Sequence, residues 1–405
     1  MKTCGIVVEY NPFHNGHRYH IQAAKEKTGA EYMIAVMSGN FLQRGEPALV
    51  SKFYRAKMAL LGGADIVVEL PYAFSTQKAD DFARGAVEIL HALGCERICF
   101  GSESGHIDAF RNTLDYLKEK EAEYNELVKQ YMAEGVSYPK ASALAFSNLP
   151  SPKANVIDLS KPNNILGYHY LKAIDHLGIT MVGETIRRIG SGYHDENLSS
   201  ERISSATGIR KQLFADEQSL DSIRGQVPET TYFLLEEYRE KFGTFARWEN
   251  YWPFLKFRIL QSTPEELKEI YEMEEGLENR IISAALYADG FQTFMERLKT
   301  KRYTWTRLQR VLTHVLTNTK KDEMKEASKK ARYIRLLGAN RKGRNYLRKK
   351  KEELTLPLIS KLSGAPEALL KLDIRAGQIY SFGYPEPVRE QLMKMDFQQP
   401  PVILE

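Results

Sequence analysis

Two histidines stand where an apolar stretch of the sequence gives way to a polar one. The segment "NPFHNGHRYH", residues 11–20, follows the apolar "GIVVEY" and holds His14 and His17 with Gly16 between them. A glycine at a strand-to-helix turn lets the backbone approach a ligand, and the helix that starts there directs unpaired N–H groups and its positive dipole end to the same place. Two imidazoles can add donors for phosphate oxygens and for the charge that builds at an α-phosphorus during transfer. The pattern H-x-G-H therefore predicts an anion site that works by electrostatics, without a covalent intermediate.

Three other interpretations of these histidines stay open at this point. His14, His17 and His20 could hold a metal, although positions i, i+3 and i+6 do not share one helix face and no cysteine pair or H-E-x-x-H accompanies them. The imidazoles could instead only cap or pack the helix. A dinucleotide-binding fold is the weakest of the three, because no G-x-G-x-x-G follows the first expected strand.

A second group of polar residues lies far along the chain. The segment "RISSATGIRK", residues 202–211, presents the hydroxyls of Ser204, Ser205 and Thr207 before an expected helix, with Arg210 inside its first turns. Hydroxyls and a guanidinium at a helix start can clamp a phosphate. The alternative is an ordinary helix N-cap.

Short apolar runs alternate with amphipathic ones through the first 100 residues. We expect strands within residues 3–10, 31–39, 65–71 and 97–103, and helices within 16–29, 52–64 and 80–94. Repeated βα units of this kind predict an α/β fold with a parallel sheet. Ligands bind outside the carboxyl ends of such strands, so "NPFHNGH", "SGNFLQRG", "ELPYAF" and "GSES" are expected along one rim.

The length of the chain, 405 residues with 43% hydrophobic, favours two domains. A long charged helical stretch covers about residues 107–146, and from about residue 220 the pattern is mostly helical. We place a boundary near residues 215–230, which divides the chain into a domain of residues 1–220 and a domain of residues 221–405.

The sequence also indicates where the protein works. Cys4, Cys95 and Cys99 match neither a zinc pair nor a disulfide framework, which favours buried thiols in a reducing cytosol. No apolar run approaches the roughly 20 residues needed to span a bilayer, and the first residues lack a signal-peptide core. We expect a soluble, cytoplasmic protein without a membrane partner, and no protein partner is evident.

Basic residues are concentrated in one segment. Between Glu296 and Lys351, 20 Lys or Arg residues stand against four acids, a balance of +16 in a chain whose net charge is +5. Because so few acids balance these cations, we favour a polyanionic partner for this segment, RNA above all, over the usual solvated helix face. Tyr333 and Tyr346 are interleaved as expected stacking surfaces. The expected RNA-binding residues are Arg341, Lys342, Arg344, Arg348, Lys349, Lys350 and Lys351.

Several motifs together resemble a known family. "GIVVEYNPFHNGHRYH", "VMSGNFLQRGEPA", "ADIVVELP", "FARGAVEIL", "FGSES" and "DLSKPNNILGYHYL" are similar to the bacterial tRNA(Met) cytidine acetate ligases, and "RISSATGIRK" resembles the late I-S-S/T-x-x-I-R motif of their H-x-G-H nucleotidyltransferase superfamily. The resemblance covers most of the first 215 residues, whereas the C-terminal half is similar mainly in being helical and basic. The segment "RRIGSGYHD", with Gly190 and Gly192, departs from the pattern.

The resemblance implies a Rossmann-like parallel-sheet nucleotidyltransferase domain followed by a mainly α-helical basic domain. It implies that acetate attacks the α-phosphorus of ATP, releasing diphosphate and forming acetyl-adenylate, and that the wobble cytidine of elongator tRNA(Met) then takes the acetyl group as N4-acetylcytidine and releases AMP. Mg²⁺ is expected with the diphosphate, although no carboxylate cage is visible.

The resemblance also implies site residues. The catalytic pair is His14 and His17. The implied ATP-binding set is Val7, Val8, Glu9, Tyr10, Asn11, Pro12, Phe13, His14, Asn15, Gly16, His17, Arg18, Tyr19, His20, Gly101, Asn163 and Arg188, with Ser205, Thr207 and Arg210 from the superfamily motif. Taken singly, Gly101 could be an ordinary turn glycine, Asn163 a helix N-cap and Arg188 a surface charge.

Two rival functions are kept. One is a small-molecule adenylyltransferase or carboxylate–amine ligase, whose activity would not need the basic helices. The other is a non-catalytic RNA-binding protein, which would show no ATP-dependent exchange.

Overall fold

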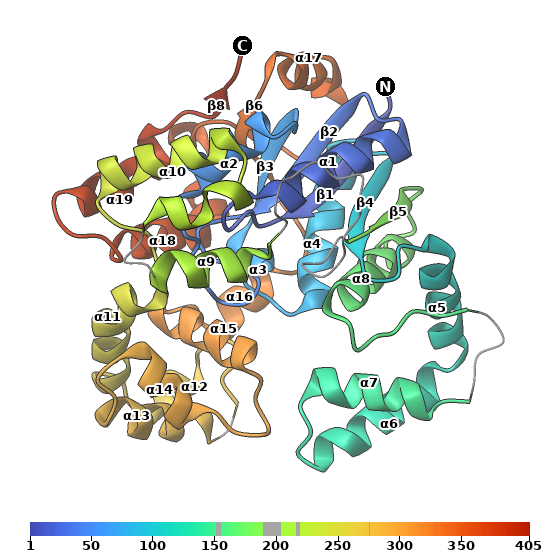
Figure 1. Ribbon diagram of the computed structural model, residues 1–405. Helices are drawn as coiled ribbons and strands as arrows, with labels where there is room; N and C mark the ends of the chain where they lie inside the picture. The colour runs from blue at the N-terminus through green and yellow to red at the C-terminus, as the bar shows by residue number, and fades with distance from the viewer. Residues whose placement is uncertain (151–154, 189–203, 216–218, 275) are drawn as a thin grey trace.

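The computed structural model describes residues 1–150, 155–188, 204–215, 219–274 and 276–405. Within these residues an eight-stranded sheet forms the centre of the molecule, with the order β5-β4-β1-β2-β3-β6-β7 and with β8 beside β6 (Figure 1). The strands are β1 (Thr3–Val8), β2 (Tyr32–Ser38), β3 (Ile66–Leu70), β4 (Arg97–Ser102), β5 (Val182–Arg187), β6 (Ile334–Ala339), β7 (Leu358–Ile359) and β8 (Val402–Ile403). β1 to β5 are parallel, and β6 is antiparallel to β3.

The parallel strands are buried because helices cover them. Every residue of β3 is buried, and so are six of the seven in β2, as expected for apolar strands without a solvent face. The helices that follow the strands are α1 (Asn15–Thr28), α2 (Lys52–Leu61), α3 (Tyr72–Ser75), α4 (Ala79–Ala92) and α8 (Pro162–His176). The predicted α/β fold is confirmed, and all four predicted strands are present.

Two groups of helices extend from the carboxyl edge of the sheet (Figure 1). One follows β4 and comprises α5 (Ile107–Glu119), α6 (Glu121–Ala133) and α7 (Tyr138–Asn148). The other follows α9 (Ala206–Ala215), η1 (Leu220–Gln226) and α10 (Glu229–Phe242), of which α10 packs beside α2, and it comprises α11 (Trp248–Leu260), α12 (Pro264–Lys268), α13 (Leu277–Leu286), α14 (Phe291–Leu298), α15 (Trp305–Leu316) and α16 (Lys321–Ala327). Thr313 of α15 donates to the carbonyl of Gly45 at 2.8 Å, which joins the second group to a rim loop.

The last quarter of the chain returns to the sheet. β6 pairs with β3 and leads into α17 (Arg341–Lys350) and η2 (Lys351–Glu353), and η3 (Leu362–Gly364), α18 (Glu367–Ser381) and α19 (Val388–Gln398) follow. The range predicted as a helical domain, residues 221–405, thus also contributes three strands, because the apolar run around β6 finds an open edge at β3. The boundary near residue 220 stays a prediction.

The predicted burial of the thiols is confirmed, since Cys4, Cys95 and Cys99 are all free and buried. In the part of the chain that the structure describes, no helix is both long and apolar enough to cross a membrane.

Candidate active site

The loop between β1 and α1 crosses the carboxyl rim of the sheet. Its conformation is fixed from below, since the side-chain oxygen of Asn11 accepts a hydrogen bond from the Leu49 N–H at 2.6 Å. Tyr10 and Phe13 are each only 1% exposed. The Phe13 ring lies against Gly62, where an added Cβ would come within 2.2 Å of it. The loop therefore holds the first turn of α1 in one position.

The two histidines cap this helix reciprocally. Nδ1 of His14 accepts the N–H of Gly16 at 3.1 Å, and Nδ1 of His17 accepts the N–H of His14 at 3.2 Å. A neutral imidazole that accepts through Nδ1 carries its proton on Nε2. Both rings therefore offer an Nε2–H donor, and backbone hydrogen bonds set both tautomers.

The rings of His14 and His17 stack with their centroids 3.6 Å apart, and the Tyr10 ring meets His17 edge to face at 4.8 Å. Burial, aided by the charge of Arg188, lowers the pKa of His14 to about 3. Burial also holds the pKa of His17 well below its usual value, with His14 and Arg188 adding to the effect. Both imidazoles are neutral at physiological pH, so they can offer hydrogen bonds but no positive charge.

His20 lies one turn further along α1. Burial and Arg188 lower its pKa to about 4, and its Nε2 is buried without a hydrogen-bond partner among the described residues. A buried polar atom of this kind is costly unless a ligand or water meets it.

The predicted residues Gly101, Asn163 and Arg188 lie together on the neighbouring side of the rim. Nη1 of Arg188 donates to the side-chain oxygen of Asn163 at 3.2 Å. A Cβ on Gly101 would meet the Arg188 side chain at 3.0 Å, so a glycine gives this arginine its place. Glu103 completes the group, because its carboxylate accepts the side-chain amide of Asn163 at 2.7 Å and the N–H of Asn164 at 2.8 Å.

Sequence reasoning missed Glu103. The signal was present in "GSES", which stands at the end of an expected strand, but the charge partner of an acid in a loop does not follow from spacing. The carboxylate meets the N-terminus of α8, where the helix dipole favours a negative charge.

The helix α9 brings a further predicted residue to the loop. Arg210 donates to the carbonyl of Asn11 at 2.8 Å and pairs with Glu46 at 2.6 Å. Ser205 caps the helix, since its hydroxyl accepts the N–H of Gly208 at 3.1 Å, and the Thr207 side chain is exposed. Gly190, Gly192 and the start of "RISSATGIRK" up to residue 203 lie outside the described residues.

The remaining residues of the predicted set at positions 7–20 divide by burial. Buried ones support the loop, and half-buried or exposed ones line it. Val8, Tyr10, Asn11, Pro12, Phe13 and Asn15 are buried, Val7, Glu9, Gly16, Tyr19 and His20 are half-buried, and Arg18 is exposed.

The predicted RNA-binding residues lie at the other edge of the sheet. The residue before α17, Asn340, bonds to Asp65 just ahead of β3, and Lys342 reaches the carbonyl of Glu31 just ahead of β2. Both contacts are at the amino ends of the parallel strands, so α17 is opposite the rim (Figure 1). Arg341, Lys342, Arg344, Arg348, Lys349 and Lys351 are exposed, and Lys350 is half-buried.

The expectation that Tyr333 and Tyr346 offer stacking surfaces is wrong. They are 4% and 0% exposed. The Tyr346 hydroxyl donates to the carbonyl of Leu93 at 2.7 Å, and the Tyr333 hydroxyl donates to the carboxylate of Asp373. Both tyrosines belong to the protein core, and their hydroxyls form hydrogen bonds inside it.

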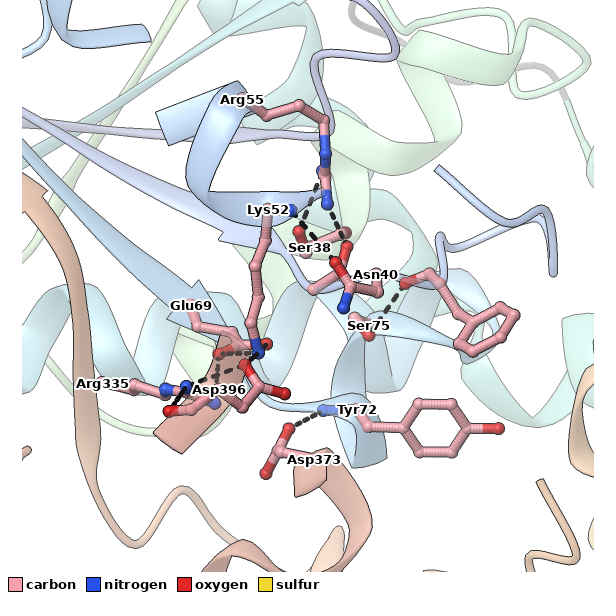
Figure 2. A network of polar contacts seen from close by, with 12 residues as sticks. Ser38, Asn40, Lys52, Arg55, Glu69, Tyr72, Ser75, Arg335, Asp373 and Asp396 are labelled. Atoms are coloured by element: carbon pink, nitrogen blue, oxygen red, sulfur yellow. Dashed lines mark hydrogen bonds and ion pairs between the residues drawn. The ribbon is translucent and has the colours of Figure 1, made fainter. Parts of the chain in front are cut away.

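A buried network of charges adjoins the rim and was not predicted (Figure 2). Lys52 pairs with Glu69 at 2.9 Å and with Asp396 at 2.8 Å. Arg335 of β6 pairs with the same two acids at 3.1 and 3.0 Å. The network joins α2 and β3 to the C-terminal segment, and Asp373 lies beside it with its pKa raised to about 6 by burial.

Comparison with known proteins shows the family to which the chain belongs. A family model described as HIGH Nucleotidyl Transferase matches residues 1–396. The tRNA(Met) cytidine acetate ligase of Bacillus licheniformis is 52% identical over 405 residues, which cover 99% of this chain and 97% of that protein. The chain belongs to this family of HIGH nucleotidyl transferases. The ligase of Lysinibacillus sphaericus is 48% identical over 403 residues, 99% of this chain and 100% of that protein.

Solved structures agree with this family assignment. The chain is similar to TmcAL from Thermotoga maritima without ligand, with a TM-score of 0.90 and 34% identity, and to the same protein bound with alpha-thio ATP, with a TM-score of 0.89 and 33% identity. Each comparison covers 100% of both chains. The predicted resemblance is confirmed, and it extends to the C-terminal half.

Proposed function

We propose that the protein activates acetate with ATP and transfers the acetyl group to the wobble cytidine of elongator tRNA(Met), forming N4-acetylcytidine. The observation that carries this proposal is the stacked pair His14 and His17, whose Nε2–H donors stand at the start of α1 beside Gly16. The names of the relatives and the alpha-thio ATP bound by the Thermotoga protein support it.

The first step is adenylyl transfer. Acetate is already anionic at neutral pH, so its oxygen attacks the α-phosphorus of ATP without a general base. The bond to the bridging oxygen of the diphosphate breaks, and acetyl-adenylate and diphosphate result. Neutral donors from His14 and His17 stabilise the charge that develops on the phosphate oxygens.

The second step is acyl transfer. The exocyclic amine of cytidine attacks the acetyl carbonyl, the bond to the adenylate oxygen breaks, and AMP leaves. The amine loses one proton, and the product is an amide. This step needs the base to reach the same rim on which the adenylate was formed.

The neighbouring group at the rim fits the rest of the nucleotide. We assign ATP to the edge between the His14–His17 loop and the group formed by Gly101, Asn163 and Arg188, where β1 and β4 lie side by side and the strand order reverses. Arg188 is exposed and close enough to influence the pKa of both histidines, which supports a cation beside the two side chains that we propose as phosphate donors. Arg210 ties α9 to the loop from the other side.

Mg²⁺ is the cation that a triphosphate usually brings. Among the described residues no group of three or more His, Cys, Asp or Glu side chains could hold a metal ion. Mg²⁺ brought by ATP would neutralise charge on the diphosphate as it leaves.

The basic helix α17 is proposed to hold the body of the tRNA. It is separated from the rim by the length of the strands; β3 has 5 residues, which is about 17 Å. A tRNA is long enough to bridge such a distance, so cations at one edge can retain the RNA while one base reaches the other edge.

Acetate-dependent exchange of labelled diphosphate into ATP tests the first step. We expect exchange with acetate, and we expect His17→Ala to lower its rate by roughly 10²-fold or more, the effect of removing one preorganised donor. His91→Ala, an exposed histidine at the end of α4, is the matched control and should leave the rate unchanged. Exchange that ignores acetate would favour the rival adenylyltransferase, and no exchange at all would favour the rival RNA-binding protein.

A further inference from the structure

Arg55 of α2 is a fully buried arginine (Figure 2), and its hydrogen-bond partners among the described residues are all backbone carbonyls. Its Nε donates to the carbonyl of Val50 at 3.2 Å. Its Nη1 donates to Glu9 at 2.7 Å and to Ser38 at 3.0 Å, and its Nη2 donates to Gly39. One side chain thus joins four carbonyl groups from three segments.

Three of these carbonyls mark the rim of the sheet. Glu9 is the first residue after β1, Ser38 is the last residue of β2, and Gly39 follows it. β1 and β2 are hydrogen-bonded neighbours, with Val8 opposite Met37. Arg55 therefore fixes the two strand ends relative to each other, directly before the loop that carries His14 and His17.

The charge on Arg55 has no direct counter-ion among the residues that the structure describes. Among the described residues no carboxylate forms an ion pair or hydrogen bond with it, whereas Lys52, one turn earlier in α2, contacts both Glu69 and Asp396. Glu69 is further shared with Arg335, and the carboxylate of Glu9 accepts the N–H of Gln43 at 2.7 Å. Burial lowers the pKa of Arg55 to about 10, with Glu9 and Glu69 nearby opposing the shift, so the group is a cation at neutral pH.

We propose that Arg55 is a further positioning residue of acetate activation: it fixes the ends of β1 and β2 directly before the His14–His17 loop, where the proposed function brings acetate to ATP, and its charge, which no described carboxylate contacts directly, attracts the acetate anion. This inference rests on the proposed function.

Two physical arguments support the assignment. A buried charge that no described carboxylate contacts directly is costly to keep, even where carbonyl groups accept its hydrogen bonds. The other cations near the rim are less suited, because His14 and His17 are neutral, Arg188 and Arg44 are exposed, and Lys52 and Arg210 are each paired with a carboxylate. A charge in a low-dielectric region acts on anions more strongly than one in water.

Steady-state exchange kinetics on two variants separate the charge from the cross-link. Arg55→Met removes the charge and keeps an unbranched side chain, and we expect the KM for acetate to rise about tenfold or more. Arg55→Lys keeps the charge but cannot bond three rim carbonyls at once. We expect its acetate KM to stay within about threefold of the wild type while kcat falls.

Lys57→Met is the matched control, because this lysine lies on the same helix and is half-exposed beside Glu237. It should leave the acetate KM unchanged, and thermal unfolding should show all variants folded. A folded Arg55→Met protein with a wild-type acetate KM would overturn the proposal. If that variant does not fold, an Arg55→Lys protein whose acetate KM rises tenfold would overturn it equally.

Equilibrium binding of ATP separates this proposal from the proposed function. ATP is also an anion at the rim, so Arg55→Met should weaken its binding, and this measurement needs no acetate. A wild-type protein that shows no acetate-dependent exchange would contradict the proposed function alone, whereas unchanged ATP affinity together with unchanged acetate KM in the variant would contradict the role of Arg55.

Discussion

At the scale of single residues, the sequence predicts which side chains act but not their protonation. The H-x-G-H string at a strand-to-helix turn indicated a phosphate site because glycine, helix N-terminus and imidazole share one chemistry. That Nδ1 of both His14 and His17 accepts a backbone N–H depends on loop geometry, so the Nε2–H tautomers follow only from the structure. Arg55 was missed for a similar reason, since a cation within an apolar helix gives no sign that it reaches four carbonyls.

The neutral state of His14 predicts a dependence of stability on pH. Its folded-state pKa of about 3 lies below the ordinary value of 6.5. Between these values the unfolded chain binds a proton that the folded chain does not, so the free energy of unfolding falls as the pH falls, and nothing changes above pH 7. At pH 5 this single group lowers the free energy of unfolding by about 2 kcal/mol.

The variant His14→Asn isolates this effect, because asparagine can still cap α1 but does not titrate. Denaturant unfolding at pH 7 and pH 5 should show a smaller loss of stability for the variant than for the wild type, by about 2 kcal/mol. Equal losses in both proteins would mean that His14 is protonated in the folded state.

At the scale of elements, the rim was predictable and its cross-links were not. Parallel strands bring their carboxyl ends to one edge, so four loops distant in sequence were expected together and are found together. The contact of Glu103 with the start of α8 joins residues 60 or 61 positions apart. Hydrophobic periodicity carries no information about such a contact, because it places elements on a face without pairing their polar ends.

The bridge made by Glu103 predicts an effect on nucleotide binding. Glu103→Ala leaves the N–H groups of Asn163 and Asn164 without their acceptor and frees Asn163, which holds Arg188. We expect the Kd for ATP to rise about tenfold, the effect of losing one or two charge-assisted hydrogen bonds. Asp108→Ala, an exposed acid in the first turn of α5, is the control. An unchanged Kd in Glu103→Ala would place the nucleotide away from α8.

At the scale of the whole molecule, the basic helix α17 and the candidate ATP site lie at opposite edges of one sheet. The sequence predicted a basic segment and an ATP site but not their separation, because that depends on β6 pairing antiparallel with β3 and turning α17 toward the amino ends of the strands. The sequence did not predict that the C-terminal segment adds strands to the sheet. The apolar strand β6 is only 6 residues long and stands between basic runs, so its strand pattern is weak.

This separation predicts that tRNA binding and acetate activation fail independently. Changing Lys349, Lys350 and Lys351 together to Glu should weaken tRNA binding and reduce its salt dependence, by roughly one unit of slope for each lost phosphate contact. Acetate-dependent exchange should remain nearly intact.

The control for this triple variant changes Lys241, Lys371 and Lys394, three exposed lysines outside the basic segment, to Glu. The affinity for tRNA is measured at several salt concentrations in each protein. An affinity and slope that equal those of the control would place the RNA site elsewhere. Equal loss of binding and exchange would mean that α17 also supports the rim.

The most direct measurement combines both halves of the reaction. The protein is incubated with ATP, labelled acetate and total tRNA, the RNA is digested, and its nucleosides are separated. We expect label in N4-acetylcytidine from the wobble position of elongator tRNA(Met), dependent on ATP and lost in His17→Ala. Label that stays in acetyl-adenylate or in a small-molecule product, with none in cytidine from a protein that shows acetate-dependent exchange, would contradict it.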